Sequence, residues 1–153
     1  MRSLLILYSY HHHNTEKIAN VFAKVLDAEI RTPMEIDPDE VQKFDLIGFG
    51  SGIYDGKHHT SLIDLAERLP EASDGRSFIF STSFDTRIDQ IHSELRGRLE
   101  SKGFIVIDEF NCKGFNTNSF LKYFGGLSKG RPNAEDLGRA EEFAKGLKTK
   151  IET

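Results

Sequence analysis

Residues 4–19 read LLILYSYHHHNTEKIA and decide how the rest of the chain is organised. The run from Leu4 to Tyr8 is uninterrupted apolar sequence, which is typical of a strand that a parallel sheet buries on both faces. Polar residues follow at 9–14, and an amphipathic helix then begins, with Asn14 or Thr15 placed to cap it. Backbone N–H groups and the positive end of the helix dipole point into such a loop, so the stretch predicts an anion site suited to a phosphate.

Length and composition describe an ordinary folded globule. The chain has 153 residues, 29% charged and 38% hydrophobic, which suits a single domain over 1–153. No apolar stretch approaches about 18 residues and no signal peptide precedes the first strand, so we expect a cytoplasmic protein without membrane insertion. A net charge of −4 without a basic cluster argues against nucleic acid as a partner. The one cysteine, Cys112, excludes an internal disulfide and predicts a small buried hydrophobic side chain.

Short apolar runs alternate with helical patterns along the whole chain. Strands are predicted at 4–8, 29–31, 46–49, 78–80 and 104–107, and helices at 15–27, 60–69, 88–101 and 134–150. This alternation predicts an α/β fold with a doubly wound, five-stranded parallel sheet in a three-layer α/β/α arrangement. With right-handed crossovers, the order 2-1-3-4-5 fits. Ligands of such sheets bind at the carboxyl ends of the strands where the order reverses, which here places the loops 9–14 and 50–59 together.

One pattern makes the topology more specific. Tyr8, Asn14-Thr15-Glu16 and Ala19, spaced as they are around the first strand, loop and helix, resemble the phosphate loop of the flavodoxins. The usual loop of that family is rich in Ser, Thr and Gly, whereas imidazoles and one Tyr occupy it here. The resemblance implies that the terminal phosphate of a noncovalent FMN is held by Ser9, Tyr10, His11, His12, His13, Asn14 and Thr15. Protonated histidines and Lys17 would add positive charge.

The second loop, residues 50–59, is rich in glycine. By the resemblance its FMN contacts come from Ser51, Gly52, Ile53, Tyr54 and Gly56. The glycines allow the backbone to approach a flat ring, and Tyr54 is the one aromatic residue that could stack on a flavin. The alternative is an ordinary turn with a surface tyrosine.

The third loop follows the strand at 78–80. In the flavodoxins the corresponding loop covers the other side of the isoalloxazine, which implies contacts from Thr82, Ser83, Phe84 and Asp85. Phe84 would be the wall, and Asp85 would disfavour an anionic reduced flavin. The alternative is a helix-capping turn with Phe84 inside the core.

Residues His11–His13, with His58 and His59, also raise a metal hypothesis, since imidazoles ligate zinc and nickel. Three adjacent imidazoles at 11–13 cannot easily aim at one ion, and no cysteine or carboxylate lies at ligand spacing beside them. We therefore predict no metal site.

Several functional classes remain to be compared. A response-regulator receiver shares the topology but needs acids after the first strand, an Asp after the third and a Lys after the fifth, which this chain lacks. We expect a flavodoxin-like electron carrier that serves redox partner proteins as a monomer or weak homodimer. The alternative is an FMN-dependent oxidoreductase, a quinone reductase or an enzyme similar to the menaquinone-dependent protoporphyrinogen oxidases, which share the features of residues 51–59. In that alternative 111–132, otherwise a folded-back flap or a partner surface, would supply a cavity wall.

Overall fold

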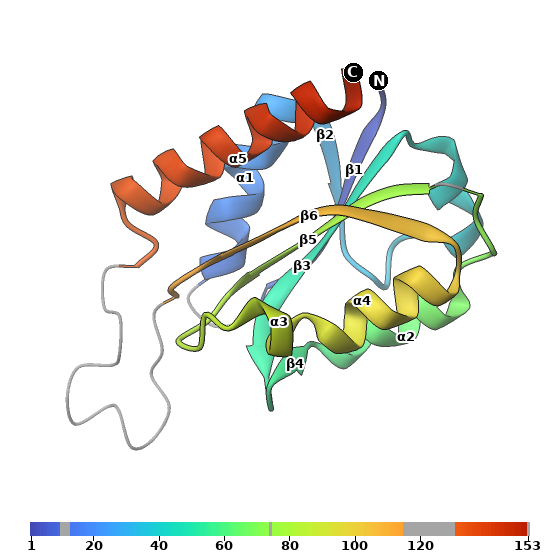
Figure 1. The fold of residues 1–153 in the computed structure, drawn as a ribbon, viewed down its shortest axis with the longest axis horizontal. Coiled ribbons are helices and arrows are strands. Elements are labelled where there is room, and N and C mark those ends of the chain that lie inside the picture. The colour runs from blue at the N-terminus through green and yellow to red at the C-terminus, as the bar shows by residue number, and fades with distance from the viewer. Residues whose placement is uncertain (10–12, 74, 115–130, 153) are drawn as a thin grey trace.

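The computed structural model describes residues 1–9, 13–73, 75–114 and 131–152 (Figure 1). Its sheet has parallel strands in the order β2-β1-β3-β5-β6, with the short β4 paired antiparallel to β3. The strands are β1 (Ser3–Tyr8), β2 (Ala28–Arg31), β3 (Leu46–Tyr54), β4 (Lys57–His58), β5 (Gly75–Thr82) and β6 (Phe104–Cys112). The helices are α1 (Asn14–Leu26), the 3-10 helix η1 (Pro38–Lys43), α2 (Thr60–Arg68), α3 (Ile88–Ile91), α4 (Ser93–Ser101) and α5 (Ala134–Glu152).

The predicted topology is confirmed. With β4 set aside, the strands follow the order 2-1-3-4-5 when the parallel strands are counted along the chain. Tyr8 of β1 pairs with Ser51 of β3, and Ser51 pairs with Ser81 of β5. These three residues therefore stand level near the carboxyl edge of the sheet, which is where the predicted loops begin.

Two layers of helices cover the sheet. Figure 1 shows α1 and α5 on one face and α2, α3 and α4 on the other. The centres of their apolar faces are buried, as at Ile18 and Leu65, because amphipathic helices gain stability by packing on the sheet. Within the described ranges, no helix combines the length and apolar character that a membrane span requires.

The α1/α5 face is built on two glycines of β3. A Cβ atom at Gly48 would come within 2.4 Å of the Phe78 ring, and one at Gly50 within 2.1 Å of the Phe80 ring. Both positions therefore exclude a side chain, and the two phenylalanine rings lie directly against the strand.

The strand β6 contains a bulge that decides which of its side chains face which helices. Val106 pairs with Ser77 but Asp108 pairs with Phe78, so Ile107 is an extra residue. A bulge of one residue reverses the alternation of side chains beyond it. Phe110 consequently joins the α1/α5 core, while Glu109 points toward α3 and α4.

The helix predicted over 88–101 is wrong in its continuity. Instead α3 ends at Ile91, α4 begins at Ser93, and His92 occupies the turn between them. The apolar spacing of Ile91, Leu95 and Leu99 is preserved across this turn, and all three side chains are buried, so periodicity alone does not reveal the break.

Candidate functional site

At the carboxyl edge of the sheet, the start of α1 meets the end of β5 and the residues just after β6. The start of α1 contacts the end of β5, because the hydroxyl groups of Thr15 and Thr82 are hydrogen-bonded at 2.8 Å and both side chains are buried. Gly114, just after β6, packs against the same pair of segments: a Cβ there would lie 2.8 Å from Asn14 Nδ2 and 3.2 Å from Thr82 Cβ. The first and third predicted loops are thus adjacent.

The start of α1 differs from the prediction in how it is capped. Asn14 is the first helical residue and His13 is the N-cap, in a left-handed conformation with φ 52° and no side-chain cap hydrogen bond. The expected cap by Asn14 or Thr15 is therefore wrong. Ser9 takes part of that role, since its hydroxyl accepts a hydrogen bond from the Glu16 N–H at 3.3 Å. Tyr10, His11 and His12 lie outside the described residues.

The second predicted loop is largely a β-hairpin. The turn between β3 and β4 is Asp55-Gly56, whose φ angles are 51° and 80°. Positive φ at both central residues is the signature of a type I′ turn, which suits the twist of a two-residue hairpin. Ser51 is fully buried and serves the hairpin itself: its hydroxyl donates to the Gly52 carbonyl at 2.6 Å and accepts from the His59 N–H at 3.1 Å.

An aromatic group stands on this hairpin, and sequence reasoning found only one of its members, Tyr54. The rings of Tyr8 and His59 are stacked, with centroids 3.6 Å apart and planes 10° apart. Tyr54 meets His59 edge to face at 5.1 Å, and its ring also lies over Gly52. Burial raises the pKa of the Tyr54 phenol and lowers that of the His59 imidazole, so both remain neutral near pH 7.

The tautomer of His59 follows from its hydrogen bonds. The Ser61 N–H donates to His59 Nδ1 at 3.1 Å, which caps α2. A neutral imidazole that accepts at Nδ1 carries its proton on Nε2. His59 therefore offers an N–H donor at the switch point of the sheet. The position of the two residues in the sequence could have predicted that their rings meet. Tyr8 is the last residue of a strand and His59 comes directly before a helix, so both lie at the carboxyl edge of the sheet.

The third loop is open to solvent at its tip. Phe84 is 53% exposed, so the alternative in which it belongs to the core is wrong. Asp85 is bound by Arg87, whose Nη2 lies 2.7 Å from Oδ2, and hydrogen bonds from Arg87 hold the pKa of the Asp85 carboxyl at about 2. The Asp85–Arg87 ion pair leaves less net negative charge at the loop than Asp85 alone would.

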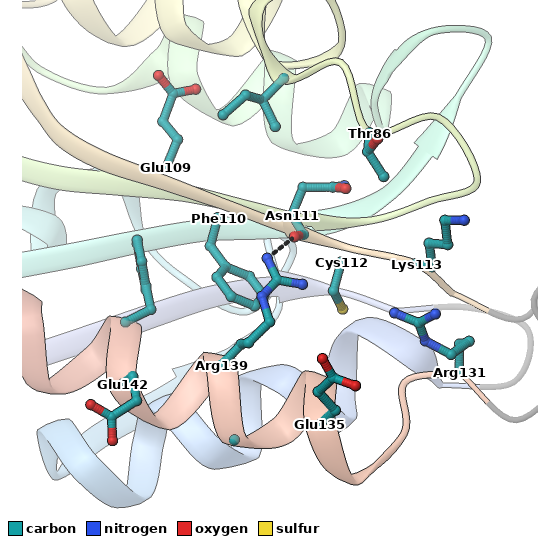
Figure 2. A pocket seen from close by; sticks show the side chains of 13 residues that line it. Thr86, Glu109, Phe110, Asn111, Cys112, Lys113, Arg131, Glu135, Arg139 and Glu142 are labelled. Carbon is teal, nitrogen blue, oxygen red and sulfur yellow. Dashed lines mark hydrogen bonds between the residues drawn. The ribbon is translucent and has the colours of Figure 1, made fainter.

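A large cavity lies elsewhere, between the outer edge of β6 and the first half of α5 (Figure 2). Its volume is about 1060 Å³, and it extends from Thr86 near the third loop to Glu142 on α5. Figure 2 shows Arg139 reaching across it to the Asn111 backbone carbonyl, at 3.4 Å, with its guanidinium over the Phe110 ring. We name this space the β6/α5 cleft.

Cys112 lies in the β6/α5 cleft, but its side chain is buried. Burial, with a further contribution from the charge of Asp136, raises the pKa of its thiol to about 12. A thiol so far from ionisation is not a nucleophile at neutral pH, so Cys112 fills space as a small hydrophobic side chain. The segment 115–130, which belongs to the region predicted as a flap or partner surface, lies outside the described residues.

Among the described residues, no group of three or more His, Cys, Asp or Glu side chains is placed to hold a metal ion. His13 instead pairs with Glu16, with Nδ1 2.7 Å from the carboxylate on the surface of α1.

Comparison with known proteins agrees with this architecture. The family model for the flavodoxin domain matches residues 5–126. An uncharacterized protein of Methanocaldococcus jannaschii is 45% identical over 148 residues, which cover 96% of this chain and 98% of that protein.

Solved structures show the same fold at low sequence identity. A flavodoxin from the domain Archaea superposes with a TM-score of 0.71 at 11% identity, covering 100% of both chains. Flavodoxin 2 from Bacillus cereus gives a TM-score of 0.74 at 17% identity, covering 98% of this chain and 99% of the other.

Proposed function

This chain belongs to the flavodoxin family, and from that premise we propose that it binds one FMN noncovalently and carries electrons between redox partner proteins. The observation that carries the proposal is the meeting of three segments at one edge of the sheet. The Thr15–Thr82 hydrogen bond joins the start of α1 to the third loop. The β3–β4 hairpin starts from the same edge, where Ser51 of β3 pairs with Tyr8 at the end of β1. This is the topological switch point, where ligands of open α/β sheets bind.

The start of α1 suits an anionic phosphate. The helix dipole favours negative charge there, and the N-cap residue His13 supplies no side-chain hydrogen bond of its own. The phosphate would be held by Ser9, Tyr10, His11, His12, His13, Asn14 and Thr15. The Thr15 hydroxyl is occupied by Thr82, so Thr15 would contribute its backbone N–H.

The hairpin and the third loop suit a flat aromatic ring between them. Tyr54 would pack on the isoalloxazine, with the stacked Tyr8–His59 pair supporting it, and the exposed Phe84 would cover the opposite side. The other contacts would come from Ser51, Gly52, Ile53, Gly56, Thr82, Ser83 and Asp85. When bound, FMN supplies one-electron and two-electron transfer, while the protein supplies orientation and electrostatics.

A specific observation also favours a second candidate, an FMN-dependent oxidoreductase. The β6/α5 cleft begins at Thr86, the last residue of the third loop, and its volume of about 1060 Å³ is ample for a small organic substrate. Phe110 and Phe143 supply apolar surface, and Lys113 and Arg139 supply positive charge. A quinone would suit that lining.

The proposed cofactor is tested by titrating the flavin-free protein with FMN and, as a matched ligand without the phosphate, riboflavin. We expect binding of FMN at one to one with quenched flavin fluorescence, and riboflavin binding weaker by roughly 10- to 100-fold because charge-assisted hydrogen bonds to the phosphate are lost. Tyr54→Ala should weaken FMN by about 1–3 kcal/mol, by analogy with base stacking on aromatic residues, whereas Tyr54→Phe keeps the ring and should not. Equal affinity for FMN and riboflavin would contradict the phosphate assignment.

The carrier and the enzyme are then separated by turnover. A carrier loaded with FMN and reduced chemically should pass electrons rapidly to a protein acceptor such as cytochrome c, and should oxidise NAD(P)H slowly. Rapid turnover with a quinone, abolished by filling the β6/α5 cleft with Gly138→Trp, would favour the oxidoreductase.

A further inference from the structure

A chain of buried and half-buried polar side chains runs beneath the third loop, on the face of the sheet covered by α3 and α4. It passes from helix α4 through strands β6 and β5 to the loop itself. Its members, in order of contact, are Arg96, Glu109, His92, Ser81, Asn111 and Ser83.

The first half of this chain fixes the imidazole of His92. Arg96 holds both carboxylate oxygens of Glu109, with Nε 2.8 Å from Oε2 and Nη2 2.6 Å from Oε1. His92 Nδ1 lies 2.9 Å from the same Oε1. Burial alone would raise the pKa of Glu109, but the hydrogen bonds from His92 and Arg96 lower it to about 2. Glu109 is therefore a carboxylate at any ordinary pH.

The charge of Glu109 fixes one proton of His92. A carboxylate can only accept hydrogen bonds, so His92 Nδ1 carries a proton and donates a hydrogen bond to Glu109. On the other side of the ring, His92 Nε2 is hydrogen-bonded to the Ser81 hydroxyl at 2.6 Å. The Asn111 side-chain amide donates to the same Ser81 oxygen at 2.7 Å, so this hydroxyl joins His92 to Asn111.

The second half of the hydrogen-bond chain reaches the third loop. The Asn111 amide also donates to the Ser83 hydroxyl at 3.0 Å, and that hydroxyl donates to the Asp85 backbone carbonyl. The Ser83 N–H is held by the Cys112 carbonyl at 3.0 Å. The backbone of Ser83 and Asp85 is therefore tied to the end of β6 and, through Asn111 and Ser81, to His92.

The spacing of Ser81, His92 and Glu109 matches the Ser-His-acid arrangement of acyl-transfer enzymes. Ser81 and His92 are fully buried, however, and His58 packs against His92 with ring centroids 4.9 Å apart. A hydroxyl with no access to solvent cannot attack a substrate, so nucleophilic catalysis is excluded. Buried polar networks of this kind instead fix one arrangement of the groups they connect.

We propose that this hydrogen-bond chain positions the third loop, residues 82–86, from within the sheet, and that His92 is the positioning residue at its centre. The effect on flavin binding rests on the proposed function, because it requires FMN to contact that loop. The ordering of the loop does not, and can be measured on the protein without flavin.

Two substitutions of His92 each break the hydrogen-bond chain on a different side of this residue. Asparagine places its amide near the position of Nδ1, so His92→Asn keeps the contact with Glu109 and loses the one with Ser81. Glutamine reaches the position of Nε2, so His92→Gln keeps Ser81 and loses Glu109. Amide hydrogen exchange of Ser83, measured relative to Ile79 in the centre of β5, should become about tenfold faster in His92→Asn and change less than about twofold in His92→Gln. Normalising to Ile79 removes any general loss of stability.

The flavin readout is the affinity for FMN and its midpoint potential. Wild-type protein must first bind FMN, which tests the proposed function alone; His92→Asn should then bind about tenfold more weakly with a shifted potential, and His92→Gln should resemble wild type. Arg98→Gln, which removes the ion pairs with Glu67 and Glu94 from the far half of α4, is the matched control and should alter neither readout. If His92→Asn does not fold, Asn111→Ser interrupts the hydrogen-bond chain at its next contact, between Ser81 and Asn111, and should give the same exchange at Ser83. Equal Ser83 exchange in both His92 variants, or no change in either, would overturn the proposal.

Discussion

The two faces of the sheet are filled in different ways. Against α1 and α5 the centre of the core is aromatic: Phe22 contacts the rings of Phe78, Phe80, Phe110 and Phe143 at centroid distances of 5.1–5.7 Å. Against α2, α3 and α4 the core is mostly aliphatic. Toward the carboxyl edge it gives way to the buried side chains of His58, Ser81 and His92.

This difference indicates a division of labour. Apolar burial stabilises the fold without specifying where a loop lies, whereas a buried polar group costs stability unless it is hydrogen-bonded in one geometry. We expect the aromatic face to be the principal source of the domain's stability, and the polar end of the other face to set the position of the third loop. Each half of that comparison can be tested by substitution.

The largest effect should come from the aromatic face. Phe22→Ala removes the ring that contacts four other phenylalanine rings, and large-to-small core changes of this kind cost about 3–5 kcal/mol. The free energy of unfolding from urea titration measures it. Phe84→Ala is the matched control, since that ring is exposed, and should change stability by less than about 0.5 kcal/mol. A loss below 1 kcal/mol (a rough threshold) for Phe22→Ala would mean that the aromatic face is not the principal source of stability.

A smaller, pH-dependent effect should come from the polar end of the other face. Burial, and then the neighbouring His92, lower the pKa of His58 to about 3, from an ordinary value near 6.5. Between those values the unfolded chain binds a proton that the folded chain does not. Above pH 6.5 His58 is neutral in both states and costs no stability. As the pH falls below that value, proton uptake by the unfolded chain lowers the free energy of unfolding by up to about 1.4 kcal/mol per pH unit.

The variant for this measurement is His58→Gln, whose amide can still donate to the Phe80 carbonyl that His58 Nε2 contacts at 2.9 Å. Between pH 6.5 and pH 4.5, the free energy of unfolding should fall by roughly 2–3 kcal/mol more in wild type than in the variant. Protonation of Glu109 also lowers the stability of the fold, but mainly below pH 4.5, the ordinary pKa of the carboxyl, and Glu109 is present in both proteins. Parallel pH curves for the two proteins would show that His58 is not kept neutral by burial.

Much of the fold was predictable because its signals are local. The apolar run from Leu4 to Tyr8, the helical spacing that follows it and the regular alternation afterwards specify the strand order. The hairpin was also encoded, since Asp55-Gly56 is a strong type I′ signal, but the glycine-rich sequence around it was interpreted as a loop.

The buried polar chain was not predictable, because it depends on pairing between distant strands. Without the extra residue Ile107, the alternation set by Phe104 and Val106 would point Glu109 away from His92. His92 itself was hidden within a helical period that continues through the break between α3 and α4. Nothing in the local sequence around His92 or Glu109 predicts that these two residues are in contact.

The most direct test of the flavin site is a map of backbone amide chemical shifts during titration of the nitrogen-15-labelled protein with FMN. We predict that the largest changes fall on 13–15, 51–59 and 82–86, the three segments that meet at the carboxyl edge of the sheet, while 135–150 of α5 change little. Largest changes along α5 and the outer edge of β6, with these three segments unaffected, would place the ligand in the β6/α5 cleft and contradict the account.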